Sequence, residues 1–378
     1  MLLFSALMEK YSFIYFLAFI ALVWGWAYRI FRLQQSLNMT PFINPGTRPE
    51  SHAEKISVVI PMKNEETNVQ ACLEALLKQD YQNFEIIVIN DNSSDRTGEI
   101  LKSFPSVICV ENKTPTPEGW TGKNFAIHQG ISKASGTWLL FTDADTRHEQ
   151  TSLSASIAHL HKKDLEFLTL LPRCLCESFI EKTIQPIAMA FLGLWFPIQK
   201  VNDPKSSMYF GNGQYLMIKK KLYDRLGGHE AVRGEFLEDY GFARKVKEAK
   251  ARGECAMGKD IYGTRMYHSF DTAWKGWRRI YLHAFRKNSG VLLSHAAETF
   301  FLSVLPFLML LVPGLPAGLA RGFLGLCILI YITSWKAYKY LDAEAKFSLL
   351  HPIASISIVL FLLDAFWVSV SGKKTVWR

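Results

Sequence analysis

Between residues 55 and 145, short apolar runs alternate with longer amphipathic stretches. The apolar runs have the length of strands and cover residues 56–61, 84–89, 107–110 and 138–142. The stretches between them place apolar side chains on one helical stripe and cover residues 66–78, 95–104 and 123–134. This alternation predicts an α/β domain in which a mixed, mainly parallel sheet carries helices on both faces.

Long uncharged stretches occur towards both ends of the chain. Residues 11–28 lie between Lys10 and Arg29 without a charge, which is enough to span a bilayer. Because the arginines follow this run and no small-residue cleavage site ends it, we expect an uncleaved anchor over 1–34, with the next domain on the cytoplasmic side. Two or three further spans or re-entrant helices are expected within 291–378, from the runs 299–320, 322–335 and 348–372.

The topology of the C-terminal segment is less constrained than its number of spans. Two basic groups favour the same side of the membrane although one span separates them: Lys336, Lys339 and Lys346 on one hand, and Lys373, Lys374 and Arg378 on the other. Prolines 306, 313 and 316 would reconcile these groups by forming a broken helix or a hairpin. Residues 183–199 are uncharged but short for a span, which favours an interfacial helix over a buried core helix.

Composition agrees with a soluble domain joined to membrane segments. The 378 residues are 49% hydrophobic and 20% charged, between the values of globular and multi-span proteins. The net charge of +9 suits an anionic membrane surface or substrate. We expect no nucleic-acid partner, because the basic residues collect beside apolar segments and no recognition motif is present. Six scattered cysteines without a CxxC pair favour neither zinc nor disulfides.

Polar residues follow three of the predicted strands. Asn64 and Glu65 come after the first strand, Asp91 after the second, and Asp143 and Asp145 after the fourth. Ligands bind outside the carboxyl ends of parallel strands, so these side chains should converge on one cleft. The sequence lacks the GxGxxG and GxxxxGK[ST] turns, which argues against dinucleotide and P-loop binding. A nucleotide held by acidic side chains and a metal is the remaining interpretation.

Asp143 and Asp145 are the candidate metal ligands. Two hard carboxylates at a strand end can bind Mg²⁺ or Mn²⁺, which would neutralise a diphosphate leaving group. Aspartates at strand ends are often turn or cap residues, but the position after a buried strand favours the metal role here. By contrast, Asp95 is assigned to the cap or loop geometry, and Asp91 to a ligand, because Asn-Ser-Ser-Asp precedes a predicted helix.

Five segments in order resemble the family 2 inverting glycosyltransferases, which have the Rossmann-like GT-A fold. They read SVVIPMKNEE, IIVINDNSSDRT, GWTGKNFAIHQG, LLFTDAD and FLEDYGFARKV, and define a domain over residues 50–290. The chain is also similar to membrane-anchored bacterial enzymes of this family that glycosylate carotenoids or hopanoids. The resemblance implies a UDP-sugar donor, a lipid or carotenoid acceptor, and Mg²⁺ or Mn²⁺.

Matched residue by residue, the resemblance assigns roles. It makes Asp91 a uridine-side ligand, and Asp143 and Asp145 the binders of nucleotide and metal. Lys123, at a helix N-terminus, would face the diphosphate. Asp239 would be the catalytic base and its neighbour Glu238 a second catalytic residue, whereas an acidic first turn of a helix is the structural alternative. Asn64 and Glu65 would contact the donor, and Gly213 lies in the expected acceptor-side loop 211–214, before a predicted strand over 215–218.

Two departures from the family pattern matter. Asn90 stands where the family usually has the first of two adjacent acids. The Gln-x-x-Arg-Trp box of processive members is replaced by Trp-Lys-Gly-Trp-Arg-Arg over residues 274–279, which points to a single transfer. We expect Trp274 and Trp277 at the membrane interface near an apolar acceptor. Arg278 is a candidate ligand of the diphosphate, with snorkelling beside the following span as the alternative.

The sequence therefore predicts an inverting enzyme of the cytoplasmic membrane whose catalytic domain faces the cytoplasm. It would transfer one hexose, glucose from UDP-glucose, to a hydroxyl of an apolar acceptor such as a hydroxylated carotenoid. A polyprenyl-phosphate sugar synthase is the main alternative, and its ionised acceptor would need no strong base. A processive polysaccharide synthase is less favoured because the box is missing and the spans are few. A non-catalytic scaffold would not need acids at three strand ends.

Overall fold

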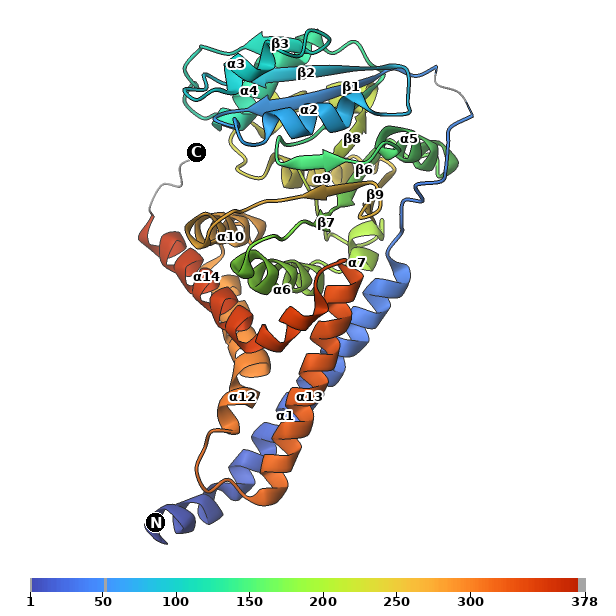
Figure 1. Ribbon diagram of the computed structural model, residues 1–378. Coiled ribbons are helices and arrows are strands. Elements are labelled where there is room, and N and C mark those ends of the chain that lie inside the picture. The colour runs from blue at the N-terminus through green and yellow to red at the C-terminus, as the bar shows by residue number, and fades with distance from the viewer. Residues whose placement is uncertain (1, 51–52, 373–378) are drawn as a thin grey trace. The chain divides into compact units, whose positions relative to one another are not determined.

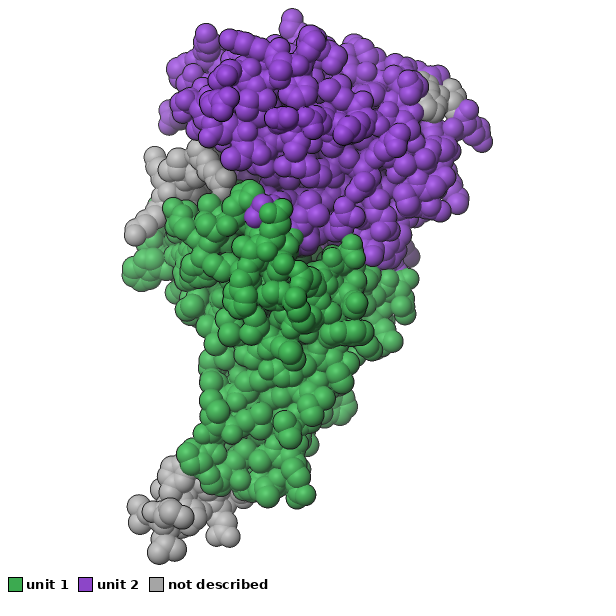
Figure 2. All heavy atoms as spheres, viewed as in Figure 1, with its two compact units in different colours: residues 1–38, 176–197, 267–374 green, residues 39–175, 198–266, 375–378 purple. Residues whose placement is uncertain are grey.

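The computed structural model describes residues 2–50 and 53–372. These residues form two units (Figure 2). One unit, here called the catalytic unit, comprises Met39–Leu175 and Ile198–Met266. The other, the helical unit, comprises residues 1–38, Cys176–Pro197 and Tyr267–Lys374. The predicted domain over 50–290 therefore includes two segments that the structure groups with the helices at the ends of the chain.

A seven-stranded mixed sheet forms the centre of the described catalytic unit, in the order β3-β2-β1-β4-β8-β6-β9 (Figure 1). Strands β3, β2, β1 and β4 run parallel, β8 is antiparallel to both β4 and β6, and β9 is parallel to β6. The predicted strands are confirmed to within one residue at each end. The strands are β1 (Ile56–Met62), β2 (Phe84–Asn90), β3 (Ile108–Glu111), β4 (Trp138–Phe141), β6 (Phe167–Leu171), β8 (Leu216–Lys219) and β9 (Gly253–Met257).

Helices cover both faces of this sheet, as the sequence predicts. In β1, Val58 and Ile60 point to one buried cluster and Val59 to the other, because side chains alternate along a strand. The first cluster includes residues of α2 (Val69–Leu77) and α5 (Ser152–Lys162), and the second residues of α4 (Gly122–Gly130) and α9 (Glu238–Glu248).

Shorter elements complete the catalytic unit. The helices predicted over 66–78, 95–104 and 123–134 are present, but the first two are shorter than predicted. α2 begins only at Val69, because residues 66–68 form a turn, and the second helix is limited to Thr97–Leu101. A small sheet has the order β5-β10-β7. The remaining elements are α3 (Thr97–Leu101), η1 (Ile131–Lys133), β5 (Thr146–His148), β7 (Arg173–Cys174), α7 (Ile198–Asn202), α8 (Lys220–Arg225), η2 (Gly228–Val232) and β10 (Tyr262–Thr264).

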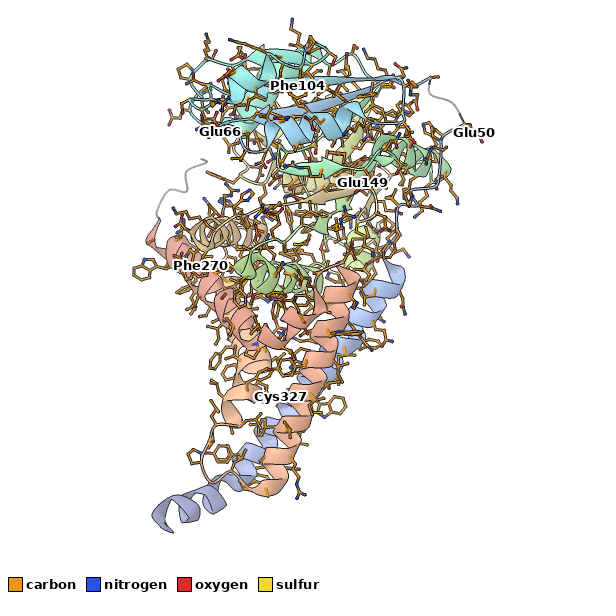
Figure 3. The ribbon with its side chains drawn as sticks, in the orientation of Figure 1. Glu50, Glu66, Phe104, Glu149, Phe270 and Cys327 are labelled. Atoms are coloured by element: carbon orange, nitrogen blue, oxygen red, sulfur yellow. The ribbon has the colours of Figure 1, made fainter. Side chains whose placement is uncertain are left out.

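Four helices of the described chain are long and apolar enough to cross a membrane, over Phe13–Met39, Ser289–Met309, Ala317–Tyr340 and Ala345–Ser371. The Figure 3 label Cys327 lies on the third of them, α13. The elements of the helical unit are α1 (Leu2–Met39), α6 (Phe179–Trp195), α10 (Phe270–Ala284), α11 (Ser289–Thr299), η3 (Phe300–Val304), α12 (Leu305–Met309), α13 (Ala317–Tyr340), η4 (Ala345–Leu350) and α14 (His351–Ser371).

The candidate spans refine the predicted membrane segments. The N-terminal helix continues five residues beyond the predicted anchor. The described C-terminal segment contains three candidate spans, where two or three are predicted. Its first helix begins at Ser289, ten residues before the predicted start, and passes through a π-helical turn. Pro313 and Pro316 lie in the connection to α13, which favours the hairpin. Lys373, Lys374 and Arg378, used in the topology prediction, lie outside the described residues.

The apolar segment predicted over 183–199 forms α6, which begins at Phe179 after a capping box of Ser178 and Glu181. Much of this helix is buried by its neighbours in the helical unit. The carbonyl of Thr183 accepts a hydrogen bond of 2.9 Å from the Tyr338 hydroxyl on α13. Helix–helix packing therefore buries residues of α6 that the apolar pattern assigns to a membrane interface.

One ion pair joins α1 to α11 within the helical unit. The guanidinium of Arg29 on α1 donates to Oε1 of Glu298 on α11 at 3.0 and 3.2 Å, and to Oγ of Ser303 at 2.9 Å. Arg29 also lies over the ring of Trp26. The pairing with Glu298 satisfies a charge that would be costly to leave alone in apolar surroundings.

Candidate active site

A lysine bridges two carboxylates that come from distant parts of the sequence. Lys123 Nζ lies 2.7 Å from Oδ1 of Asp143 and 2.6 Å from Oε1 of Glu238. Lys123 stands in the first turn of α4, which Thr121 caps, Asp143 follows β4, and Glu238 begins α9. Burial alone would lower the pKa of Lys123, but the two carboxylates outweigh burial and raise it. The lysine is therefore charged and ties the end of β4 to the start of α9.

Asp239, the predicted base, is held by two backbone amides. Its Oδ2 accepts a hydrogen bond of 2.6 Å from the amide of Gly213, and its Oδ1 accepts one of 2.7 Å from the amide of Tyr240. Burial, followed by the negative charge of Glu238, raises the pKa of Asp239 to about 7, against the opposing charge of Lys123. A carboxylate with a pKa near neutrality can take up a proton at physiological pH.

Two glycines let the loop before β8 approach this acidic pair. A Cβ atom on Gly211 would lie 2.1 Å from the carbonyl oxygen of Asp239, too close for any side chain without a backbone shift. A Cβ atom on Gly213 would lie 3.1 Å from Oε1 of Glu238 and 3.2 Å from Lys123 Nζ. Gly213, predicted to lie in an acceptor-side loop, therefore directly adjoins the candidate base and the bridging lysine.

Asp145 is a buried carboxylate with unused bonding capacity. Its Oδ1 atom is buried and has no hydrogen-bond partner among the described residues. Burial and the charges of Asp143 and Glu65 raise the pKa of Asp145 to about 8. A cation beside these acids would reverse the effect, because it favours the ionised form.

The donor set fits a substrate-bridging metal better than an all-protein metal cage. No group of three or more His, Cys, Asp or Glu residues is arranged to hold a metal within the described ranges. Mg²⁺ is usually held by one or two carboxylates together with substrate phosphates and waters. Asp143 and Asp145 would supply such a pair of carboxylates.

The remaining donor-side candidates lie on the loops that follow β1 and β2. Asp91 is buried, and its Oδ1 accepts a hydrogen bond of 2.7 Å from the side-chain amide of Asn112. Oδ1 of Asn64 accepts one of 2.8 Å from the amide of Ser94. Oε2 of Glu65 accepts one of 2.9 Å from Asn68. These bonds fix the two loops, and Asp91 has the buried, rigid setting expected of a ligand-binding side chain.

The structure confirms the prediction that Asp95 shapes the loop before α3. Its Oδ1 accepts the amide of Thr97 at 2.9 Å, and its Oδ2 accepts the amide of Glu66 at 3.0 Å. Glu66, labelled in Figure 3, belongs to the loop before α2. Asp95 thus links the loop after β1 to the start of α3.

Trp277 requires a correction. It was expected to face an apolar acceptor at the membrane interface, but its side chain is only 1% exposed, and its indole N–H donates to Gln185 on α6. The amphipathic pattern of α10 predicts a buried face, and that face packs on protein. Trp277 is therefore a packing residue of the helical unit.

Trp274 and Arg278 share one partner on α14. The indole N–H of Trp274 donates to Oδ2 of Asp364 at 2.6 Å, and the guanidinium of Arg278 contacts the same oxygen at 3.3 Å. Asp364, the one acidic residue between 348 and 372, is thus neutralised by a cation. Arg278 belongs to the helical unit, whereas Lys123, Asp143, Asp145 and Asp239 belong to the catalytic unit.

Sequence reasoning missed the polar residues behind the acids. Gln214 and Thr264 are buried, and the Gln214 side-chain amide donates to the Thr264 hydroxyl at 3.0 Å. The sequence signal that points to Gln214 is its place in the Gly-Asn-Gly-Gln segment, the expected acceptor-side loop. Thr264 lies on β10, far along the chain from Asp145, and no local pattern indicates their proximity.

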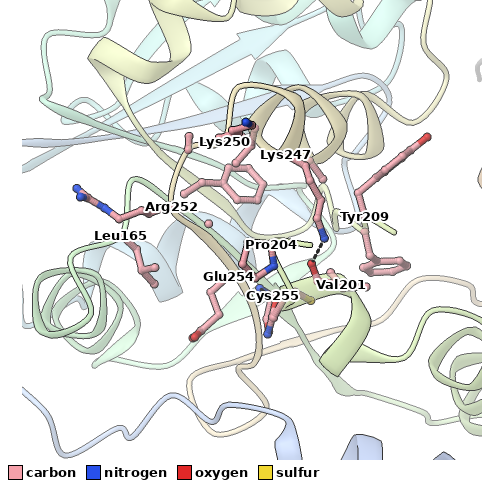
Figure 4. Close-up of a pocket in the computed structure, with 16 residues that line it drawn as sticks. Leu165, Val201, Pro204, Tyr209, Lys247, Lys250, Arg252, Glu254 and Cys255 are labelled. Atoms are coloured by element: carbon pink, nitrogen blue, oxygen red, sulfur yellow. Dashed lines mark hydrogen bonds between the residues drawn. The ribbon is translucent and has the colours of Figure 1, made fainter. Parts of the chain in front are cut away.

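A separate cavity of about 460 Å³ lies on another part of the catalytic unit (Figure 4). Residues of β6, β9, α9 and the segment 201–210 line it. Lys247 Nζ donates to the carbonyl of Val201 at 2.6 Å, the bond drawn in Figure 4. None of the predicted site residues lines this cavity, so it lies apart from the acids of the candidate active site.

The sheet order and the acids at the ends of its strands define a GT-A-like α/β enzyme. Residues 57–239, nearly half of the chain, match the family described as Glycosyl transferase family 2. This part of the chain therefore matches a family 2 glycosyltransferase domain. This domain contains all the strand-end acids described above, and it ends at Asp239.

Curated relatives are also glycosyltransferases. Glycosyltransferase GlyA of Streptococcus pneumoniae serotype 4 is 32% identical over 118 residues, which is 30% of this chain and 16% of that protein. The 4,4'-diaponeurosporenoate glycosyltransferase of Staphylococcus aureus is 21% identical over 227 residues, which is 59% of this chain and 60% of that protein. The chain thus spans less than two thirds of the length of either relative.

A solved structure supports the fold. The mannosyltransferase PcManGT from Pyrobaculum calidifontis, in complex with GDP-Man and Mn²⁺, matches with a TM-score of 0.50 at 16% identity. The match covers 98% of this chain and 100% of that chain. At this identity the similarity establishes the GT-A-like fold alone.

Proposed function

We propose that the protein is an inverting glycosyltransferase that moves a single hexose, glucose from UDP-glucose, onto a hydroxyl of a membrane-embedded apolar acceptor. A hydroxylated carotenoid or another isoprenoid lipid fits this description. The observation that carries the proposal is the bridge of Lys123 between Asp143 and Glu238. It supports a single site in which donor-side acids adjoin the candidate base, Asp239.

Asp239 acts as the general base in this proposal. It takes the proton of the acceptor hydroxyl while the oxygen attacks C1 of the sugar from the face opposite the leaving diphosphate. The bond from C1 to the diphosphate oxygen breaks as the new glycosidic bond forms. The pKa of Asp239, raised to about 7 by burial, suits this role because a base is most effective with a pKa near the working pH.

The donor occupies the loops after β1, β2 and β4. Asp91 binds on the uridine side, and Asn64 and Glu65 belong to the adjoining loop. Lys123 faces the diphosphate from the N-terminus of α4, where its charge adds to that of the free backbone amides. Mg²⁺ or Mn²⁺ held by Asp143 and Asp145 would supply Lewis-acid neutralisation of the departing diphosphate.

The acceptor comes from the bilayer. Four apolar helices support a multi-pass protein of the cytoplasmic membrane, and Arg29 and Arg32 after the first apolar run support a catalytic unit in the cytoplasm. The similarity to a 4,4'-diaponeurosporenoate glycosyltransferase supports an isoprenoid acceptor.

Transfer assays with the full-length protein in lipid nanodiscs test this proposal. UDP-glucose, UDP-galactose, UDP-N-acetylglucosamine and GDP-mannose are each offered with a hydroxylated carotenoid, a polyprenyl phosphate or a soluble sugar. We expect a single hexose on the carotenoid, from UDP-glucose, with inverted configuration at C1. Transfer to polyprenyl phosphate alone would favour the main alternative, and efficient transfer to soluble sugars alone would contradict a membrane acceptor.

A further inference from the structure

Gln214 is connected by hydrogen bonds and by the chain to two candidate site residues, the metal ligand Asp145 and the base Asp239. It directly follows Gly213, whose amide holds Oδ2 of Asp239 at 2.6 Å. Its side-chain amide donates to Oγ1 of Thr264 at 3.0 Å. Thr264 pairs with Thr146 in the small sheet, and the next amide, that of Arg265, donates to the Asp145 carbonyl at 3.3 Å. This pairing places the Thr264 hydroxyl against the carboxylate of Asp145, to which it is hydrogen-bonded. Gln214 is thus linked to Asp145 by two hydrogen bonds, by way of Thr264. It is linked to Asp239 by one hydrogen bond, by way of the Gly213 amide.

The backbone carbonyl of Gln214 is held as well. It accepts a hydrogen bond of 2.7 Å from the Thr142 hydroxyl, and Thr142 directly precedes Asp143. Thr142 also contacts Nε2 of His148 at 3.0 Å, and Nδ1 of His148 contacts Oγ of Ser152 at 3.0 Å. These side chains are buried, so their hydrogen bonds are shielded from water.

The donor and the acceptor can be assigned for the hydrogen bonds that join the Gln214 carbonyl, Thr142 and His148. Thr142 has one hydroxyl proton and donates it to Gln214, so it accepts from Nε2–H of His148. Nδ1 of His148 then lacks a proton and accepts from Ser152. Burial lowers the pKa of His148 to about 3, so the ring is neutral, as this assignment requires. The hydrogen bonds that join His148, Thr142 and the Gln214 carbonyl then run in one consistent direction, which favours a rigid arrangement.

We propose that Gln214 is a positioning residue that couples Asp145, at the donor end of the site, to the base Asp239. This inference rests on the proposed function, in which Asp145 binds the donor's metal and Asp239 deprotonates the acceptor. The hydrogen bonds of Gln214 hold its side chain and its carbonyl. The next amide, that of Tyr215, donates at 3.1 Å to the carbonyl of Asn212, which shares a peptide group with the Gly213 amide. The turn fixed in this way aims the Gly213 amide at Asp239. Misplacement of a reacting group by about 1 Å can lower a rate ~10²-fold, so this alignment affects catalysis directly.

Gln214→Met tests the side-chain connection, because methionine is similar in length and lacks the amide. We expect kcat to fall roughly 10- to 100-fold, with the KM for UDP-glucose changed less than about threefold. Thr142→Val removes the bond to the Gln214 carbonyl and should lower kcat similarly, whereas Thr142→Ser restores the hydroxyl and should recover most of the loss. Ser154→Ala removes a buried hydroxyl of α5 that bonds only to the Thr151 carbonyl and serves as the matched control.

A double-mutant cycle separates positioning from a merely structural role. If Gln214 acts through Asp239, Gln214→Met should lower the residual rate of Asp239→Asn less than about twofold. Equal loss in both backgrounds would overturn the inference, as would a kcat above about a third of wild type for both Gln214→Met and Thr142→Val.

Hydrogen–deuterium exchange provides a readout without substrate. Gln214→Met should accelerate exchange in the peptide that contains the Gly213 amide, while Ser154→Ala should not. Unchanged exchange in a folded Gln214→Met, or in Thr142→Val if Gln214→Met does not fold, would overturn the positioning role. Faster exchange together with wild-type kcat in Asp239→Asn would instead refute the proposed base while the coupling through Gln214 stands.

Discussion

The amide of Gly213 donates to Oδ2 of Asp239 across 2.6 Å, so the loop before β8 determines where the carboxylate points. A carboxylate with one oxygen fixed by a backbone group keeps its orientation better than one held only by flexible side chains. The nearby Gly211 makes this approach possible, since no side chain fits between it and the Asp239 carbonyl. The two glycines therefore give the candidate base a fixed direction.

Asp239→Asn should lower kcat by ~10²–10⁴, because it keeps the shape of the side chain and removes the base. Binding of UDP-glucose should change little, since the donor is expected to contact Asp91, Asp143 and Asp145. Steady-state transfer and isothermal titration with UDP-glucose measure the two effects. Asp224→Asn, an exposed carboxylate paired with Lys220, is the control. A kcat above about a tenth of wild type would contradict the base assignment.

The pH dependence should show the raised pKa of Asp239, about 7. Catalysis needs the ionised form, so kcat/KM should rise with pH through that value and level off above it. Stability should change in the opposite direction. Because the pKa in the folded protein is above its ordinary value, the stability contribution is fully present below the ordinary pKa and is lost as pH rises through about 7.

Asp239→Asn provides the control for this pH dependence. The variant should lose the part of the thermal-stability slope that lies between the ordinary pKa and about pH 7. A pH profile of kcat/KM for the wild type that stays flat between pH 5 and 8 would contradict the raised pKa.

Removal of the divalent ion should abolish transfer. Asp145→Ala and Asp143→Ala should each eliminate UDP-sugar turnover while the protein stays folded in the membrane. Excess EDTA should stop the wild-type enzyme, and Mn²⁺ or Mg²⁺ should restore it. Asp224→Ala is the matched control. Full activity in EDTA would refute the metal site.

Glu85 should stabilise the fold outside the active site. Burial opposes its ionisation, but hydrogen bonds from Lys55, Ser57 and Ser135 outweigh burial and lower its pKa to about 2. This stabilisation is present above the ordinary pKa of about 4.5 and is lost as pH falls towards 2. We expect Glu85→Gln to destabilise the catalytic unit by about 2–3 kcal/mol at pH 7.

Thermal unfolding at pH 7 and pH 3 measures the effect of Glu85→Gln. The melting temperatures of variant and wild type should differ clearly at pH 7 and converge at low pH. Glu99→Gln, an exposed residue of α3, should leave the melting temperature unchanged. Equal melting temperatures for Glu85→Gln and wild type at pH 7 would contradict the assignment.

The strands and the donor-side acids were predictable because their signals are local. Each predicted strand is a continuous apolar run that ends at polar residues, and parallel topology brings those ends to one edge. The order of the sheet across β8, β6 and β9 was not predictable, because antiparallel insertion of β8 depends on contacts distant in sequence. The resemblance, and not the apolar pattern, indicated Asp239.

The connections of the site could not be read from the sequence. Lys123 meets Glu238 only after the chain folds through five further strands. The diphosphate role expected of Lys123 remains a prediction. The prediction that Trp277 lies at the membrane interface is wrong for a related reason. An amphipathic helix shows that one face is buried, but the pattern does not distinguish burial against protein from burial in lipid.

The pair of Arg29 and Glu298 has a consequence for biosynthesis. The two residues are 269 positions apart, so at ~5–20 residues per second the anchor leaves the ribosome roughly 10–50 s before its partner exists. During that interval the arginine in the first helix has no carboxylate to neutralise it, and any chain that stops before residue 298 keeps it so. Under the proposed membrane arrangement, synthesis of α11, the first of the C-terminal helices, therefore marks the moment at which the first helix gains its counter-charge. A quality-control system that detects an unpaired intramembrane charge would then distinguish chains that stop before this helix.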